Sequence, residues 1–212
     1  MNRWLGRTVI FCMALIGCVL SLQYSTGHFK SERQIILLNN TRPDFHHLLQ
    51  IEKQFPEGLS SGELRDYFDY FHLVTDAMPD NSEGLLMLGY LDQITGKNVL
   101  AEGLLKESYR LNPQFFFTGY DLALVCFNRG DYAQSVDLLQ KALAINPGLT
   151  MGTMMNSIIY RQIFSSMSDG NEIIPYLKQA YNDAYVLLME SAARQKGAQG
   201  ANADIQVHAH IM

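Results

Sequence analysis

Hydrophobic residues follow two distinct patterns along this chain. Residues 8–22 form an apolar run without a charged side chain, in which no polar face recurs at the helical period. Residues 44–195 mix apolar and polar positions and are rich in Leu, Ala, Gln, Met and Glu, which favour helices over strands. The first pattern predicts a membrane segment, and the second predicts an all-α domain with a buried core.

The apolar N-terminal run has three interpretations. As an uncleaved signal anchor it spans the bilayer once, with Trp4 and Tyr24 at the interfaces. As a lipoprotein signal it resembles the bacterial lipobox, and Cys18 would be lipid-modified, although apolar residues continue at Val19 and Leu20. As a cleaved signal peptide it would release a soluble protein, but no A-x-A-like cleavage site stands out.

All three interpretations predict the same topology. Arg3 and Arg7 precede the apolar run, and no positive charge follows until Lys30. Positive charges favour the cytoplasmic side, so everything after Tyr24 is expected outside the cytoplasm. We therefore expect a membrane-anchored, single-pass protein whose helical domain is extracytoplasmic, which in a bacterium means periplasmic.

The composition divides the chain into four predicted parts. Residues 1–24 are the membrane anchor or lipoprotein signal, 25–43 a polar linker, 44–195 the helical repeat domain, and 196–212 a flexible tail without a packing pattern.

Glycine and proline recur at one spacing within the helical domain. Gly62, Gly96 and Gly130 are 34 residues apart, and Pro79, Pro113 and Pro147 follow them at the same period, each 17 residues after its glycine. Glycine provides the positive φ that ends a first helix, and proline stops the second helix. The spacing therefore predicts repeated helix-turn-helix units.

The residues between these markers resemble the tetratricopeptide repeat. The matching positions are Leu85, Leu88, Gly89, Gly96, Ala101, Leu105, Ser108 and Pro113 in one unit, and Leu122, Ala123, Gly130, Tyr132, Ser135, Leu139, Ala142 and Pro147 in the next. The resemblance covers residues 44–193 and is specific between Ser82 and Pro147. It implies an α-solenoid of about three to four hairpins, with the last formed by first-helix residues 151–167 and second-helix residues 171–193.

The family's geometry implies a concave groove lined by the first helices. Its groove-facing positions would be Glu83, Leu86, Tyr90, Gln93, Ile94, Phe117, Tyr120, Leu124, Phe127 and Asn128. The apolar and aromatic members, Leu86, Tyr90, Ile94, Phe117, Tyr120, Leu124 and Phe127, form the predicted site for a partner protein or peptide, since aromatic side chains are typical interface anchors. Alternatively, the terminal helices or a neighbouring protomer cover the same rings.

Charge and chemistry narrow the function further. After residue 24 the chain carries 14 basic and 21 acidic side chains without a basic stripe, which argues against binding nucleic acid. The paired histidines, His46 with His47 and His208 with His210, lack a third metal ligand at a recognisable spacing. Cys126 occupies a position typical of a buried side chain. No catalytic, metal or cofactor site is therefore predicted, and we do not expect an enzyme.

The sequence thus favours a membrane-tethered interaction scaffold that holds a partner peptide or helix in its groove. The alternative is a structural subunit of a larger membrane complex, because the family's architecture carries unrelated tasks.

Overall fold

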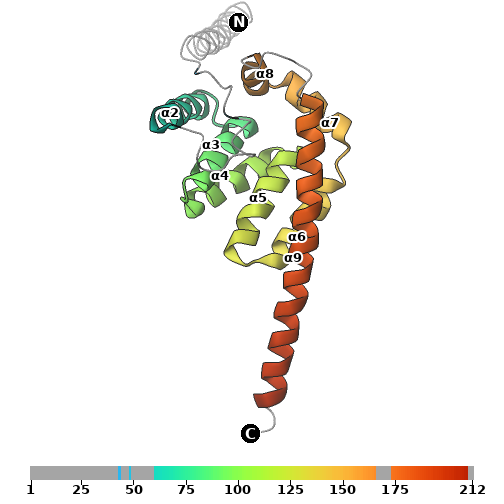
Figure 1. Ribbon diagram of the computed structural model, residues 1–212. Coiled ribbons are helices and arrows are strands. Elements are labelled where there is room, and N and C mark those ends of the chain that lie inside the picture. The colour runs from blue at the N-terminus through green and yellow to red at the C-terminus, as the bar shows by residue number, and fades with distance from the viewer. Residues whose placement is uncertain (1–42, 44–47, 49–59, 166–172, 210–212) are drawn as a thin grey trace, which may run out of the picture. The chain divides into compact units, whose positions relative to one another are not determined.

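The computed structural model describes residues 43, 48, 60–165 and 173–209. The chain divides into two units, Met1–Arg42 and Pro43–Met212, and every described residue belongs to the second. All regular elements in these residues are helices (Figure 1), as the sequence predicted for this domain. The predicted membrane segment and Cys18 lie outside the described residues, and none of the helices described has the length and apolar character needed to cross a bilayer.

Two antiparallel hairpins form the middle of the described domain. In order, the helices are α2 (Ser61–Ala77), α3 (Ser82–Ile94), α4 (Asn98–Leu111), α5 (Phe116–Arg129), α6 (Tyr132–Leu143), α7 (Pro147–Asn156), α8 (Ile158–Ser165) and α9 (Ile173–Ala209). Helix α3 packs against α4 and α5 against α6, while α2 and α4 each pack against the helix that follows. Successive helix pairs therefore stack in register, which is the arrangement that the 34-residue period predicts.

The periodic glycines and prolines explain where α3, α4 and α5 end and where α7 begins. Gly96 and Gly130 have φ angles of 76° and 87°, a left-handed conformation that glycine adopts without strain, and they end α3 and α5. Pro113 follows the end of α4, and Pro147 is the first residue of α7, where its missing N–H costs nothing.

Gly62 does not share this role, which corrects the interpretation of the first unit. It lies in the first turn of α2 and has no positive φ. The helix starts here because Ser60 forms a capping box: its Oγ accepts a hydrogen bond from the Glu63 amide at 3.2 Å, and Glu63 Oε2 accepts one from the Ser60 amide at 3.0 Å.

Small residues let the two helices of a hairpin approach closely. A Cβ atom on Gly89 would lie 2.7 Å from Cγ of Leu105, so α3 and α4 could not keep their spacing with a larger residue there. Ser108 is fully buried, and its Oγ donates a hydrogen bond to the Ser82 carbonyl at 2.7 Å. The small positions that carry the family resemblance are therefore packing positions.

The C-terminal part departs from a regular hairpin. The expected first helix 151–167 is divided into α7 and α8, because Ser157 between them is extended, with ψ at 131°. Helix α9 packs along α6, as α5 packs along α4, so α9 rather than α7 follows α6 in the stack. The described chain remains helical to Ala209. Residues 196–209 of the predicted tail belong to α9 (Figure 1), and the flexibility of the tail stays a prediction.

Candidate functional site

The N-terminal end of α5 carries a stack of aromatic rings. Phe116 is fully buried between Tyr120, whose ring centroid lies 5.5 Å away, and Tyr181 of α9, whose centroid lies 4.0 Å away. Both neighbouring rings are nearly parallel to the Phe116 ring, with interplanar angles of 14° and 13°. Such stacking adds to the burial of apolar surface, so this contact holds α9 against α5.

The neighbouring phenylalanines are covered in the same way. Phe117 is 2% exposed and stacks on Tyr176 of α9, with 5.6 Å between ring centroids. Phe115, at the N-cap of α5, meets Tyr160 of α8 edge-on, also at 5.6 Å. Helices α8 and α9 therefore cover this part of the predicted groove, as one of the two sequence interpretations expected.

Hydrogen bonds fix the position of α9. The Tyr181 hydroxyl donates to the Ile145 carbonyl at 2.9 Å and lies 3.0 Å from the Thr150 hydroxyl. Burial raises the pKa of Tyr181 despite the opposing effect of Thr150, so the hydroxyl remains a donor at neutral pH. Further along, the buried hydroxyls of Ser135 and Ser191 lie 3.1 Å apart and join α6 to α9.

Phe127, at the other end of α5, also faces α9. Its ring packs edge-on against Tyr132, with 5.5 Å between centroids, and the Arg194 guanidinium lies 4.9 Å from the Phe127 centroid. A cation over an aromatic face is attracted by the ring's quadrupole. Phe127 is therefore half-buried beneath a side chain of the same protein.

Between these covered ends, the groove remains open as a cavity of about 300 Å³. Four of the predicted apolar and aromatic groove residues line it, two from α3 and two from α5: Tyr90, Ile94, Tyr120 and Leu124. The remaining lining residues are polar, namely Gln93, Asp121, Asn128 and Asp183. The open part of the groove is thus aromatic and apolar with an acidic edge.

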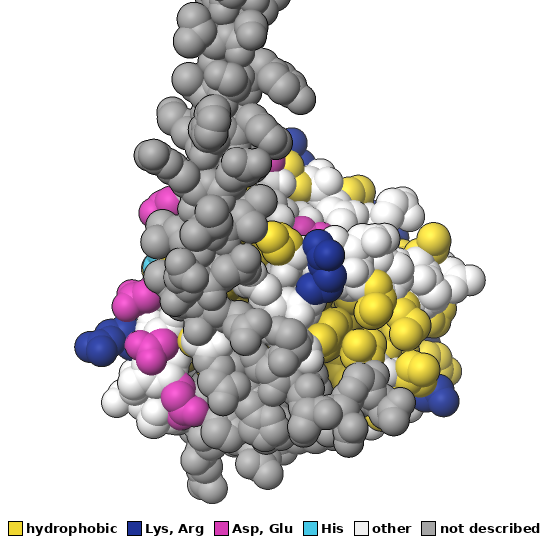
Figure 2. All heavy atoms as spheres, turned by 90° about the horizontal axis from the view of Figure 1, so that it is seen from above, with side chains coloured by type: hydrophobic (Ala, Val, Ile, Leu, Met, Phe, Trp, Pro, Cys, Tyr) yellow, Lys and Arg dark blue, Asp and Glu magenta, His cyan; other side chains and the backbone are white. Residues whose placement is uncertain are grey.

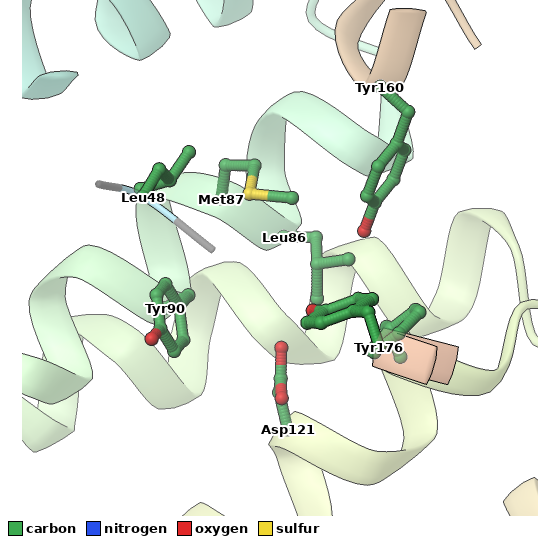
Figure 3. Close-up of a pocket in the computed structure, with 8 residues that line it drawn as sticks. Leu48, Leu86, Met87, Tyr90, Asp121, Tyr160 and Tyr176 are labelled. Atoms are coloured by element: carbon green, nitrogen blue, oxygen red, sulfur yellow. The ribbon is translucent and has the colours of Figure 1, made fainter. Parts of the chain in front are cut away.

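A smaller cavity adjoins it at Tyr90 and Asp121, which line both. Its volume is about 20 Å³, enough for a single water molecule. Leu86 and Phe117, also predicted groove residues, form part of its wall, and both are buried. Figure 3 shows the Asp121 carboxylate directed toward the space flanked by Tyr90 and Tyr176.

One polar atom in the open cavity is buried without a partner. Gln93 Oε1 accepts no hydrogen bond from the part of the chain that the structure describes, and it is shielded from solvent. A buried acceptor without a donor costs free energy, so such atoms deserve a structural or functional reason.

Four residues of this site were not predicted from the sequence: Asp121, Tyr176, Tyr181 and Asp183. Tyr176 and Tyr181 reach α5 from about sixty residues further along the chain, and Asp183 contributes to the cavity from α9. The irregular C-terminal part gave no period from which these contacts could be predicted. Asp121 was detectable in principle, because it lies between the predicted groove residues Tyr120 and Leu124.

Reactive chemistry is not concentrated at this site. Cys126 is fully buried, and burial raises the pKa of its thiol, which is the behaviour expected of a packed cysteine. Within the described ranges, no group of three or more His, Cys, Asp or Glu side chains could hold a metal ion.

Comparison with known proteins agrees with the repeat architecture. The family model described as "Tetratricopeptide repeat" matches residues 120–149, from the middle of α5 to the start of α7. A solved structure entitled "Crystal structure of MamA" is similar at a TM-score of 0.37 and 20% sequence identity, covering 66% of this chain and 92% of that one. At this level the similarity supports no inference about function. No curated protein matches the sequence. The matched segment and the stacked helix pairs show that this chain contains a tetratricopeptide repeat.

Proposed function

We propose that the protein is an interaction scaffold that holds a segment of a partner protein in the open part of its groove. The observation that carries this proposal is the cavity of about 300 Å³ between α3, α5 and α9, lined by Tyr90, Ile94, Tyr120 and Leu124. Its rings lie on rigid helices, so they can receive a partner at little cost in side-chain entropy.

Membrane attachment is the second part of the proposal. The apolar run 8–22 and the basic residues before it support an N-terminal anchor, with the groove exported and Cys18 as an alternative point of attachment through lipid. Mass measurement of the mature N-terminus distinguishes an intact anchor from an acylated Cys18 and from a cleaved signal.

The groove is tested by selecting random dodecapeptides on the full-length protein in detergent. The peptides that are enriched are then measured against Leu124→Gln, which makes the cavity wall polar, and against Leu100→Gln, the same change at a side chain that is 59% exposed on α4. We expect Leu124→Gln to weaken binding about tenfold or more, as a central interface position does. Equal binding to both variants would place the peptides elsewhere on the protein.

An exposed apolar face on α9 favours the second candidate, a structural subunit of a larger complex. Met189 lies about one turn after Tyr185 and Val186, and all three are more than half exposed. In the view of Figure 2, hydrophobic side chains gather on one side of the described surface. Blue-native electrophoresis from gentle detergent tests this candidate: a permanent subunit migrates only within one large complex, and Val186→Glu releases it.

A further inference from the structure

The open cavity presents hydrogen-bond acceptors and negative charge beside aromatic rings. Asp121 is buried and Asp183 exposed, and both acidic residues belong to its lining. Gln93 contributes a buried carbonyl oxygen that lacks a donor in the described structure. Tyr90 and Tyr120 supply the rings, and none of the described lining residues is Lys or Arg.

We propose that this cavity recognises an arginine or lysine side chain of the partner segment. The inference rests on the proposed function and names the anchor that this groove would select. The N–H groups of a cationic side chain could donate a hydrogen bond to Gln93 Oε1, and its positive charge would be attracted by the two carboxylates. The same cation could also contact the faces of the aromatic rings. A carboxylate anchor would be repelled by the negative charge of Asp121 and Asp183, and a purely apolar anchor would leave Gln93 Oε1 without a donor, which costs free energy.

The same protein already holds a lysine in this way at another place. Lys97 Nζ lies 4.4 Å from the centroid of the Phe68 ring and 3.3 Å from Oδ1 of Asp92. One ammonium group is therefore shared by a ring and a carboxylate, the two kinds of group that line the open cavity. Arg194 over Phe127 shows that a guanidinium can use a ring of α5 as well.

The size and position of the cavity indicate one anchor rather than a whole ligand. A volume of about 300 Å³ lies at the lower end of the range for ligand pockets, about 300 to 1,000 Å³. The aliphatic stem of the anchor would pack on Ile94 and Leu124 while its charged head reached the acidic edge, because long basic side chains bury their methylenes in this manner. Gln179 Nε2 donates to Asp183 Oδ1 at 2.8 Å, so that carboxylate is already oriented.

The peptide selection described above also tests this inference. Among peptides whose binding depends on Leu124, we expect Arg or Lys to be enriched at one position. Replacing that residue with citrulline for Arg, or norleucine for Lys, keeps the length and removes the charge. We expect about a tenfold or greater loss of affinity, together with weaker binding at higher salt.

Two charge-removing variants locate the anchor. Asp121→Asn and Asp183→Asn should each weaken binding of the charged peptide, and for the exposed Asp183 we expect a loss of about three- to tenfold in affinity. Neither variant should change the affinity for the neutral peptide. Asp137→Asn is the matched control, since Asp137 is an exposed acid on α6 that pairs with Lys141. Because Asp121 is buried, thermal unfolding of Asp121→Asn is first compared with that of the parent. If Asp121→Asn does not fold, binding is tested with Asp183→Asn alone.

The possible failures are distinguishable. Peptides that require Leu124 but show no basic preference, or bind Asp183→Asn and the parent equally, would overturn the cationic anchor and leave the groove function standing. A selection that yields no Leu124-dependent peptide would overturn both.

Discussion

The covered and open parts of the groove use neighbouring positions on the same helix for different purposes. Phe116 and Phe117 lie beneath α9 and are at most 2% exposed, whereas Leu124, about two turns later, lines an open cavity. The covered rings gain stability by leaving water and stacking. The open part keeps an apolar wall that is only partly buried, beside an acceptor, Gln93 Oε1, that has no donor in the described residues. If the groove binds a partner as proposed, α9 limits docking to the open part.

The largest expected effect is at the centre of the covered part. Phe116→Ala should destabilise the protein by about 3 to 5 kcal/mol, because it removes a fully buried ring and leaves a cavity between Tyr120 and Tyr181. Urea unfolding of the full chain measures the loss. Limited trypsin digestion adds a local readout: if α9 depends on this stack, cleavage at Lys178 should accelerate. Unchanged cleavage there would show that α9 is held by its other contacts.

A substitution in the open part of the groove is expected to stabilise the protein rather than destabilise it. Gln93→Leu replaces the unpaired acceptor with an apolar side chain of similar size, so we expect a gain of about 1 kcal/mol or more in the free energy of unfolding. The same variant should bind the basic peptide more weakly. A variant that is less stable than the parent would show that Gln93 supports the fold and would contradict a binding role for its buried side-chain oxygen.

A smaller effect is expected where a hydrogen bond positions α9. Tyr181→Phe keeps the stack on Phe116 but removes the hydroxyl that donates to the Ile145 carbonyl at 2.9 Å. The expected loss is about 0.5 to 1.5 kcal/mol by thermal or urea unfolding. Tyr185→Phe, at an exposed position of the same helix, is the control and should change nothing.

The smallest effect on stability is expected at the exposed acidic edge of the cavity. Asp183→Asn should change the free energy of unfolding by no more than about 0.5 kcal/mol, since its side chain is exposed and its amide can still face Gln179. Differential scanning calorimetry checks this value. A markedly larger change would show that Asp183 contributes to the stability of the fold. Asp183→Asn could then not test the cationic anchor independently of stability.

The regular hairpins could be predicted because their determinants are local. Gly96 and Gly130 end helices through their own φ angles, and Gly89 sets the helix spacing within one hairpin. These requirements repeat with the period of the fold, so one sequence displays them several times. Gly62 shares the period but not the conformation, because the capping box at Ser60 begins α2 just before it.

The covering of the groove could not be predicted in the same way. Tyr176 and Tyr181 contact residues of α5 that lie about sixty positions earlier in the sequence. The pattern of residues within α9 does not predict which helix these two rings face. The predicted groove positions Tyr90, Ile94, Tyr120 and Leu124 do come together, because the repeat geometry places them on adjacent first helices. Their role in binding stays a prediction. The acidic edge that they share with Asp183 depends on α9 and therefore became visible only in three dimensions.

The place of α9 in the stack also bears on how such a chain can grow. Arrays of this type lengthen when a unit is duplicated, and each new unit must fit the faces of both neighbours. An extra hairpin inserted between α6 and α7 would have to present a small residue where Ser135 now meets Ser191, and an acceptor for the Tyr181 hydroxyl in place of the Ile145 carbonyl. These contacts of α9 thus restrict which inserted units would fit the stack.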